Sequence, residues 1–143
     1  MRVEVGDVIP PFQLPDGATP ERMRTTAAIL RDPTPLHWDR EYTRARGFEG
    51  RLLNQTPLNM GYVLNMLMAW AGPTSVRRIR ARFPNVVLDG SPVATGGSVV
   101  AIEEVEGDRV AECEVWCDRD DEVRCLVATA WVTLPDGDDV TPR

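Results

Sequence analysis

The chain has 143 residues, 43% of them apolar and 27% charged, which is typical of one globular domain with its own core; we expect this domain to span residues 1–143. The net charge of −6 argues against a nucleic-acid-binding surface, and no segment approaches the roughly 20 apolar residues of a membrane span or contains the apolar stretch of a secretion signal. We therefore expect a cytoplasmic protein with no nucleic-acid or membrane partner.

The first part of the chain predicts an extended arm, a helix and a stiff loop. Prolines interrupt the loosely alternating residues 6–17, which is typical of a short edge strand. Thr19 as N-cap and Pro20 at the first helical position predict a helix that ends near Arg31. The Asp-Pro and Thr-Pro steps of residues 32–35 disfavour helical backbone, so a proline-rich loop follows.

A short helix and a long helix come next. The short one is predicted over residues 40–46, with Asp39 as its N-cap. The long one has Thr56 as its predicted N-cap and Pro57 at its first helical position, and it ends at Gly72. Apolar side chains cover nearly its whole circumference, so we expect a buried helix with a sheet around it.

Four valine-rich, alternating runs predict the strands of that sheet. They cover residues 75–83, 91–107, 108–118 and 122–135, and Gly, Asp and Pro turns separate them. One buried helix followed by an antiparallel meander is an α+β pattern. The three cysteines lie in these runs without Cys-x-x-Cys spacing, and we expect buried, reduced thiols that bind no metal.

The loop RDPTPLHWD, residues 31–39, contains the only histidine of the chain. Asp32 and His37 stand five residues apart in a loop stiffened by prolines, so both side chains can face one water molecule as an acid–base pair. The structural alternative is that His37 satisfies backbone carbonyls and Asp32 caps a turn. Trp38 either forms a wall of the same pocket or packs under the loop.

This loop, its place before the long helix and the order of elements resemble the MaoC-like hydratases of the hot-dog fold, which include the (R)-specific enoyl-CoA hydratases. The family motif runs roughly Gly-Asp-x-Asn-Pro-Leu/Ile-His-x-Asp. RDPTPLHWD matches it at Asp32, Pro35, Leu36, His37 and Asp39, while Arg31 replaces the glycine and Thr34 the asparagine. VGDVIPPFQLP, REYTRARGF and RARF extend the resemblance over nearly the whole chain, and WAGP resembles the end of the long helix in the actinobacterial steroid side-chain subfamily. The resemblance implies a single hot-dog domain, in which an antiparallel sheet wraps around one long buried helix.

The resemblance also implies an enzyme that adds or removes water across the α,β-double bond of an acyl thioester, carried by coenzyme A or a carrier protein. Asp32 and His37 would be its acid–base pair, and coenzyme A or phosphopantetheine would enter as part of the substrate, with no metal or other cofactor. Where the family usually has His-Gly, at the start of the long helix, this chain has Asn54-Gln55. We expect Asn54, Gln55 and Thr56 to line the substrate site, where the backbone N–H groups of residues 55–58 can polarise the thioester carbonyl.

Arginines alternate with apolar residues in the strand run VRRIRARF. We expect one face of that strand to carry Ile79, Ala81 and Phe83, and the other to carry Arg78, Arg80 and Arg82. This row of positive charge can bind the phosphates of coenzyme A or of a carrier-protein arm. The alternative is a solvated strand face that discourages edge pairing.

Other functions stay open beside the hydratase. The chain can be a non-catalytic or assisting subunit of a mixed hot-dog assembly, or a biosynthetic enzyme that reuses the pocket for cyclisation or thioester hydrolysis. Hot-dog thioesterases usually carry a carboxylate on the central helix, and residues 56–71 contain none, which disfavours hydrolysis. Exposed sheet edges predict a dimer, either with an identical chain or with another hot-dog subunit.

Overall fold

The computed structural model describes residues 2–135, so the two ends of the domain predicted for residues 1–143 lie outside the described residues. The elements in chain order are β1 (Val8–Ile9), β2 (Gln13–Leu14), α1 (Pro20–Leu30), a 3-10 turn (Pro35–His37), α2 (Arg40–Arg44), α3 (Thr56–Ala71), β3 (Val76–Arg82), β4 (Val93–Val105), β5 (Asp108–Arg119) and β6 (Val123–Thr133). All three helices and all four long strands were predicted, and α2 ends two residues earlier than expected.

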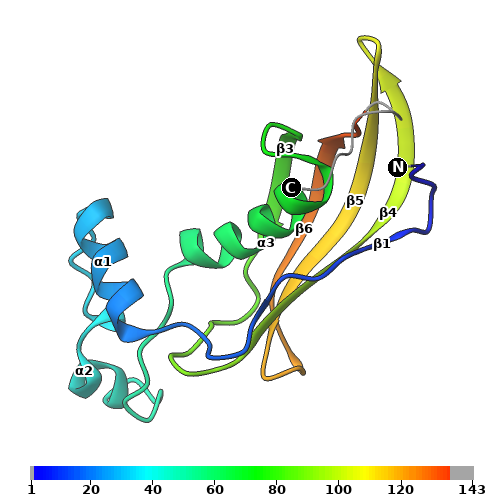
Figure 1. Ribbon diagram of the computed structural model, residues 1–143. Helices are drawn as coiled ribbons and strands as arrows, with labels where there is room; N and C mark the ends of the chain where they lie inside the picture. The colour runs from blue at the N-terminus through cyan, green and yellow to red at the C-terminus, as the bar shows by residue number, and fades with distance from the viewer. Residues whose placement is uncertain (1, 136–143) are drawn as a thin grey trace.

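The sheet is antiparallel, and its strands follow the order β1-β4-β5-β6-β3, with β2 also paired to β4. β4, β5 and β6 form the predicted meander, but the prediction is wrong for β3, which lies beside β6 at the far edge. Val76 pairs with Val132 and Arg82 with Val127, while residues 83–92 carry the chain across to β4. Figure 1 shows the long strands curving past α3 and shows α1 and α2 standing away from the sheet.

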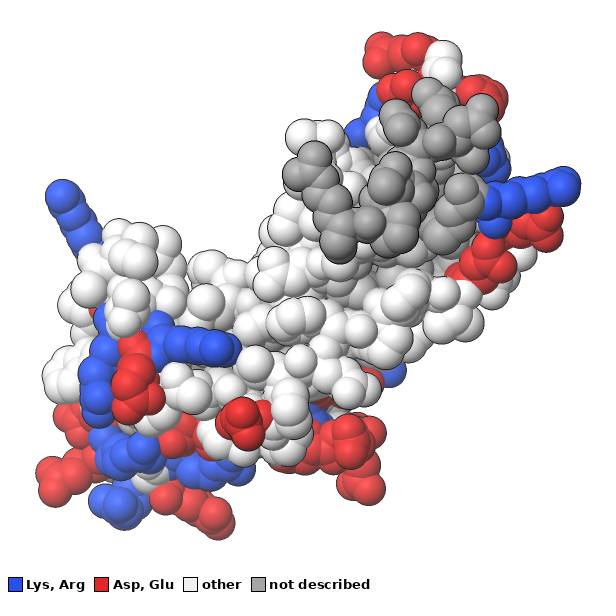
Figure 2. Space-filling view, viewed as in Figure 1, with Lys and Arg blue, Asp and Glu red and all other residues white. Residues whose placement is uncertain are grey.

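One side of α3 packs against the concave face of the sheet. Tyr62, Val63, Met66 and Leu67 are buried there in the main core. The opposite side, around Leu64, is only half-buried or exposed, so the prediction of a helix buried all round is wrong for that side. Within residues 2–135, the sheet therefore covers only one side of the helix. α3 contains no charged residue, and the part of its surface that Figure 2 leaves uncovered is white. No helix within residues 2–135 is long and apolar enough to cross a membrane.

Two of the three predicted helix caps are confirmed. The Thr19 side chain accepts a hydrogen bond from the first turn of α1, and Asp39 accepts two from the first turn of α2. The third prediction is wrong by one residue: Gln55 is the N-cap of α3, and Thr56 is already helical. Proline is compatible with either of the first helical positions, so Pro57 did not fix the start of α3 to the residue.

The three cysteines are free and buried, as predicted. Burial raises the pKa of Cys113 and of Cys117 to about 12. Their thiols therefore stay protonated and behave as small apolar side chains of the core.

Candidate active site

The structure brings Asp32 and His37 together. Nε2 of His37 lies 3.3 Å from Oδ2 of Asp32, and their side chains are 13% and 28% exposed, respectively. The N–H of Asp32 donates to the Ala27 carbonyl at the end of α1, which fixes where the loop leaves the helix. The 3-10 turn at Pro35–His37 then folds the histidine back toward the aspartate. We call these two residues the Asp32–His37 pair.

The second ring nitrogen of His37 contacts the main chain. Nδ1 lies 2.7 Å from the carbonyl oxygen of Leu53, and the Leu53 N–H donates in turn to the Leu36 carbonyl. Because a carbonyl only accepts, Nδ1 must carry a hydrogen, which leaves Nε2 to exchange a proton with Asp32. His37 thus satisfies a backbone carbonyl, as the structural alternative expects, and at the same time faces Asp32.

Asp32 is held as a carboxylate. Contact with the Thr34 hydroxyl lowers its pKa from 3.8, the Thr34 N–H adds to this with a hydrogen bond of 3.0 Å to Oδ1, and the nearby His37 acts in the same direction. Partial burial opposes these effects without reversing them. At neutral pH the pair therefore contains a ready proton acceptor beside a nitrogen that can carry a proton.

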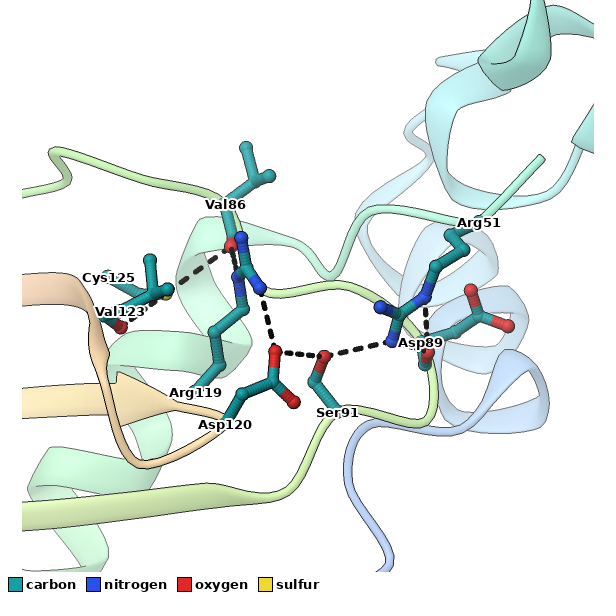
Figure 3. Close-up of polar contacts among 8 residues, drawn as sticks. All are labelled: Arg51, Val86, Asp89, Ser91, Arg119, Asp120, Val123 and Cys125. Atoms are coloured by element: carbon teal, nitrogen blue, oxygen red, sulfur yellow. Dashed lines mark hydrogen bonds and ion pairs between the residues drawn. The ribbon is translucent and has the colours of Figure 1, made fainter. Parts of the chain in front are cut away.

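Asp89 holds the segment that supplies the Leu53 carbonyl, residues 51–54, against the rest of the molecule. Figure 3 shows the contact between Arg51 of this segment and Asp89. Oδ1 of Asp89 accepts from the Leu52 N–H at 2.7 Å, and its backbone carbonyl accepts from Arg51. Arg51 also donates to Ser91, whose hydroxyl donates to Asp120 in the β5–β6 turn. The sequence indicated only a turn at Asp89, since no local pattern shows that its carboxylate reaches back across nearly 40 residues.

The side chains of Asn54 and Gln55 both turn into the protein. Asn54 is hydrogen-bonded to Asn59 at 2.7 Å and to Tyr62 at 3.2 Å, and Gln55 donates from Nε2 to the Met23 carbonyl of α1 at 2.7 Å. Each is at most 4% exposed, and each keeps one amide oxygen without a partner among the described residues. Gln55 therefore ties α1 to the start of α3, and its amide nitrogen is already engaged.

The first turn of α3 offers fewer backbone donors than expected. Pro57 has no N–H, and the N–H of Leu58 donates to the Gln55 carbonyl at 3.0 Å. Thr56 is exposed, and its N–H lies at the helix start, where no intrahelical acceptor precedes it. Of the expected donors in the helix itself, Thr56 is the one available to a substrate.

A groove of about 620 Å³ runs beside the pair, between α1 and the proline-rich loop. It is lined by Arg24, Ala27, Ala28, Arg31, Asp32, Pro33 and Trp38. Trp38 is 47% exposed and forms one wall, as the pocket interpretation of this residue expects. The part played by α1 was not predicted from the sequence. We refer to this feature as the Asp32 groove.

The arginines of β3 lie elsewhere. Ile79 and Ala81 pack against the core, so Arg78, Arg80 and Arg82 occupy the outer face of the sheet, as their alternation predicts. Arg78 stacks on Trp131, and the other two line a separate hollow of about 270 Å³ with Trp116 and Arg124. This hollow shares no lining residue with the Asp32 groove, so the structure does not bring the arginine row to the Asp32–His37 pair.

The comparison with protein families identifies the chain. The family described as "MaoC like domain" matches residues 9–117. The chain belongs to this family. This MaoC-like domain has no match among proteins with a curated description, whereas several solved structures share its fold.

Three of these structures show the extent of the likeness. The ChsH1–ChsH2 complex from Mycobacterium tuberculosis is 22% identical, with a TM-score of 0.78 over 94% of this chain and 100% of that one. The (R)-hydratase from A. caviae involved in PHA biosynthesis is 21% identical, with a TM-score of 0.79 over 93% and 98% of the two chains. The truncated HadBC (3R-hydroxyacyl-ACP dehydratase) complex from M. tuberculosis is 17% identical, with a TM-score of 0.66 over 90% and 96%. These likenesses confirm the hot-dog fold of the MaoC-like domain, and at such identities they show the fold alone.

Proposed function

We propose that this MaoC-like domain is a hydratase or dehydratase, which adds or removes water across the α,β-double bond of an acyl thioester. The observation that carries the proposal is the 3.3 Å contact between His37 and Asp32 at the side of an open groove. Membership of the family supports the reaction class. Coenzyme A or phosphopantetheine enters as part of the substrate, and the scheme needs no metal or other cofactor.

In the proposed hydration, the Asp32 carboxylate accepts a proton from the water that attacks the β-carbon. The Nε2–H of His37 delivers a proton to the α-carbon, and the Leu53 carbonyl keeps Nδ1 protonated throughout. The enolate oxygen rests against the N–H of Thr56, with Asn54 and Gln55 shaping the site from behind and Trp38 walling it. Dehydration follows the same path in reverse.

A partner with the same fold belongs to this proposal. Within residues 2–135, β3 is an edge strand that pairs only with β6, and Leu64 and Met68 on the outward side of α3 are only half-buried. Two of the similar structures are complexes, ChsH1–ChsH2 and HadBC. We therefore propose a dimer with an identical chain or another hot-dog subunit, and native mass spectrometry should find more than the 15.9 kDa of one chain. Full activity at the monomer mass would contradict it.

The test of the reaction is hydration of crotonyl-CoA, followed by the loss of enoyl-thioester absorbance. Asp32→Asn and His37→Ala should each lower kcat by ~10²–10⁴-fold, the usual contribution of a general acid or base. Asp39→Asn is the matched control, since it removes a nearby carboxylate while asparagine still caps α2. Unchanged activity in both pair variants would refute the assignment. Activity that appears only with a second hot-dog chain would instead support the assisting-subunit function.

A further inference from the structure

Arg31 lines the Asp32 groove from a strained backbone position. Its φ and ψ are 52° and 41°, the left-handed region in which glycine is favoured and a side chain costs conformational energy. Its N–H closes α1 by bonding to the Ala27 and Ala28 carbonyls, a task that glycine performs equally well. The arginine side chain therefore adds nothing to the helix end, and an outlier of this kind next to a reactive pair indicates a function for the side chain.

Arg24 lies on the same side of α1 as Arg31. The two residues are seven positions apart, which is close to two helical turns, and both line the groove. Neither guanidinium forms an ion pair or hydrogen bond with another side chain within residues 2–135. The groove thus offers two positive charges, on flexible side chains whose Cα atoms lie about 10 Å apart, in a protein whose net charge is −6.

The lining between these charges is apolar. Ala27 and Ala28 form the α1 side, and Trp38 and Pro33 form the loop side. The volume of about 620 Å³ is in the range of small-molecule sites. A chain with an apolar stem and a negative group matches such a groove, because the stem covers the alanines while the arginines neutralise the charge.

We propose that the Asp32 groove binds an anionic part of the thioester substrate, with Arg24 and Arg31 binding a phosphate or carboxylate while Asp32 and His37 act on the double bond. The inference rests on the proposed function, since it concerns the substrate of that reaction. The negative group has two possible sources: the phosphates of the carrier arm, or a carboxylate at the far end of the acyl chain.

The test compares Arg31→Gly and Arg24→Ala with the wild type on three substrates. Crotonyl-CoA carries phosphates, crotonyl-N-acetylcysteamine carries no charge, and the N-acetylcysteamine thioester of 2-hexenedioic acid carries a terminal carboxylate. We expect KM to rise roughly 5- to 20-fold, with little change in kcat, for one of the two charged substrates and not for the neutral one. The charged substrate that is affected identifies the source, and the effect should shrink at high salt.

Two controls separate binding from folding. Arg31→Gly should have a melting temperature equal to or above that of the wild type, because glycine relieves the strain of the left-handed backbone. The first control, Glu106→Gly, makes the same backbone change at φ 55° in the β4–β5 turn. The second control, Arg22→Ala, removes an exposed α1 arginine that does not line the groove. Neither control should change any KM.

Equilibrium binding keeps this inference distinct from the proposed reaction. Butanoyl-CoA and adipoyl-N-acetylcysteamine lack the double bond, so calorimetry measures their binding without turnover. If the protein hydrates no substrate but Arg31→Gly binds one of these ligands more weakly than the wild type, anion binding in the groove would be supported and the proposed hydratase reaction refuted. An active enzyme whose KM and binding constants are all unchanged in both arginine variants would overturn the groove proposal. So would variants that alter only the oligomeric state, which would make the groove a subunit contact.

Discussion

Asp89 provides the sharpest test of how the fold holds the Asp32–His37 pair. Its carboxylate is only 12% exposed; Oδ1 accepts the N–H of Leu52 at 2.7 Å, and Oδ2 accepts from Arg40 at 2.9 Å. The next residue, Leu53, supplies the carbonyl that binds Nδ1 of His37. Asp89→Ala should therefore both destabilise the protein and loosen the histidine.

The two contacts differ in strength. Leu52 is fully buried, so its N–H would lose its partner at a cost of about 1–3 kcal/mol. Arg40 is half-exposed, and its ion pair contributes at most about 1 kcal/mol. The sum is about 1–4 kcal/mol, which corresponds to a melting temperature lower by roughly 3–15 °C for a domain of this size.

Asp89→Asn is the matched variant, because its amide oxygen can still accept from Leu52 while the charge is lost. It should cost about 1 kcal/mol or less. Thermal unfolding measures the loss of stability, and crotonyl-CoA hydration measures the loosening of His37. In Asp89→Ala we expect kcat to fall by about 10-fold or more with KM unchanged, since small displacements of a catalytic group are costly. Equal stability of the alanine and asparagine variants would refute the role of the Leu52 bond, and an alanine variant with wild-type kcat would refute the link to His37.

Three further predictions concern single positions. The acid limb of kcat/KM that belongs to Asp32 should lie below pH 3.8, and Thr34→Val should move it upward in a pH–rate profile. Because folding lowers the pKa of Asp32, this group stabilises the folded chain above pH 3.8, and the contribution is lost as the pH falls through the lowered pKa. In chemical denaturation, Gly17→Ala should lower the free energy of unfolding several times more than Gly47→Ala. Both glycines have positive φ, but a Cβ at position 17 would lie 2.2 Å from a backbone oxygen, whereas a Cβ at position 47 meets open space. Cys113, buried with a pKa of about 12, should react with a thiol reagent only after unfolding; fast labelling of the native protein would contradict this.

The sequence was a good guide wherever structure is local. Thr19 and Asp39 cap the helices that they precede because a cap needs only the next three residues. The position of β3 depends on pairing between Val76 and Val132, far apart in the chain, and alternation alone cannot encode which strand is the neighbour. The apolar circumference of α3 predicted the buried side of the helix correctly, but it could not show that the side around Leu64 is only half-buried or exposed within residues 2–135.

In the candidate site, too, contacts within one short segment could be predicted from the sequence, whereas contacts between distant segments could not. Asp32 and His37 share one short loop, so their proximity could be predicted from spacing and prolines. The clamp at Asp89 and the tie from Gln55 to α1 join segments distant in sequence, and their residue types are ordinary for a turn and a helix start. Arg31 departs from the family motif in the sequence, but only the backbone angles show that it occupies a position suited to glycine.

The contact between His37 and Leu53 uses the main chain alone, and this has a consequence for how such a site can diversify. Every residue type has a carbonyl, so the histidine keeps its tautomer whatever side chain stands at position 53. Only proline is excluded on hydrogen-bonding grounds, because the N–H of that residue is needed by Leu36. The buried side chain at position 53 can therefore change in size and alter the packing behind the Asp32–His37 pair, while His37 keeps the same proton on Nδ1.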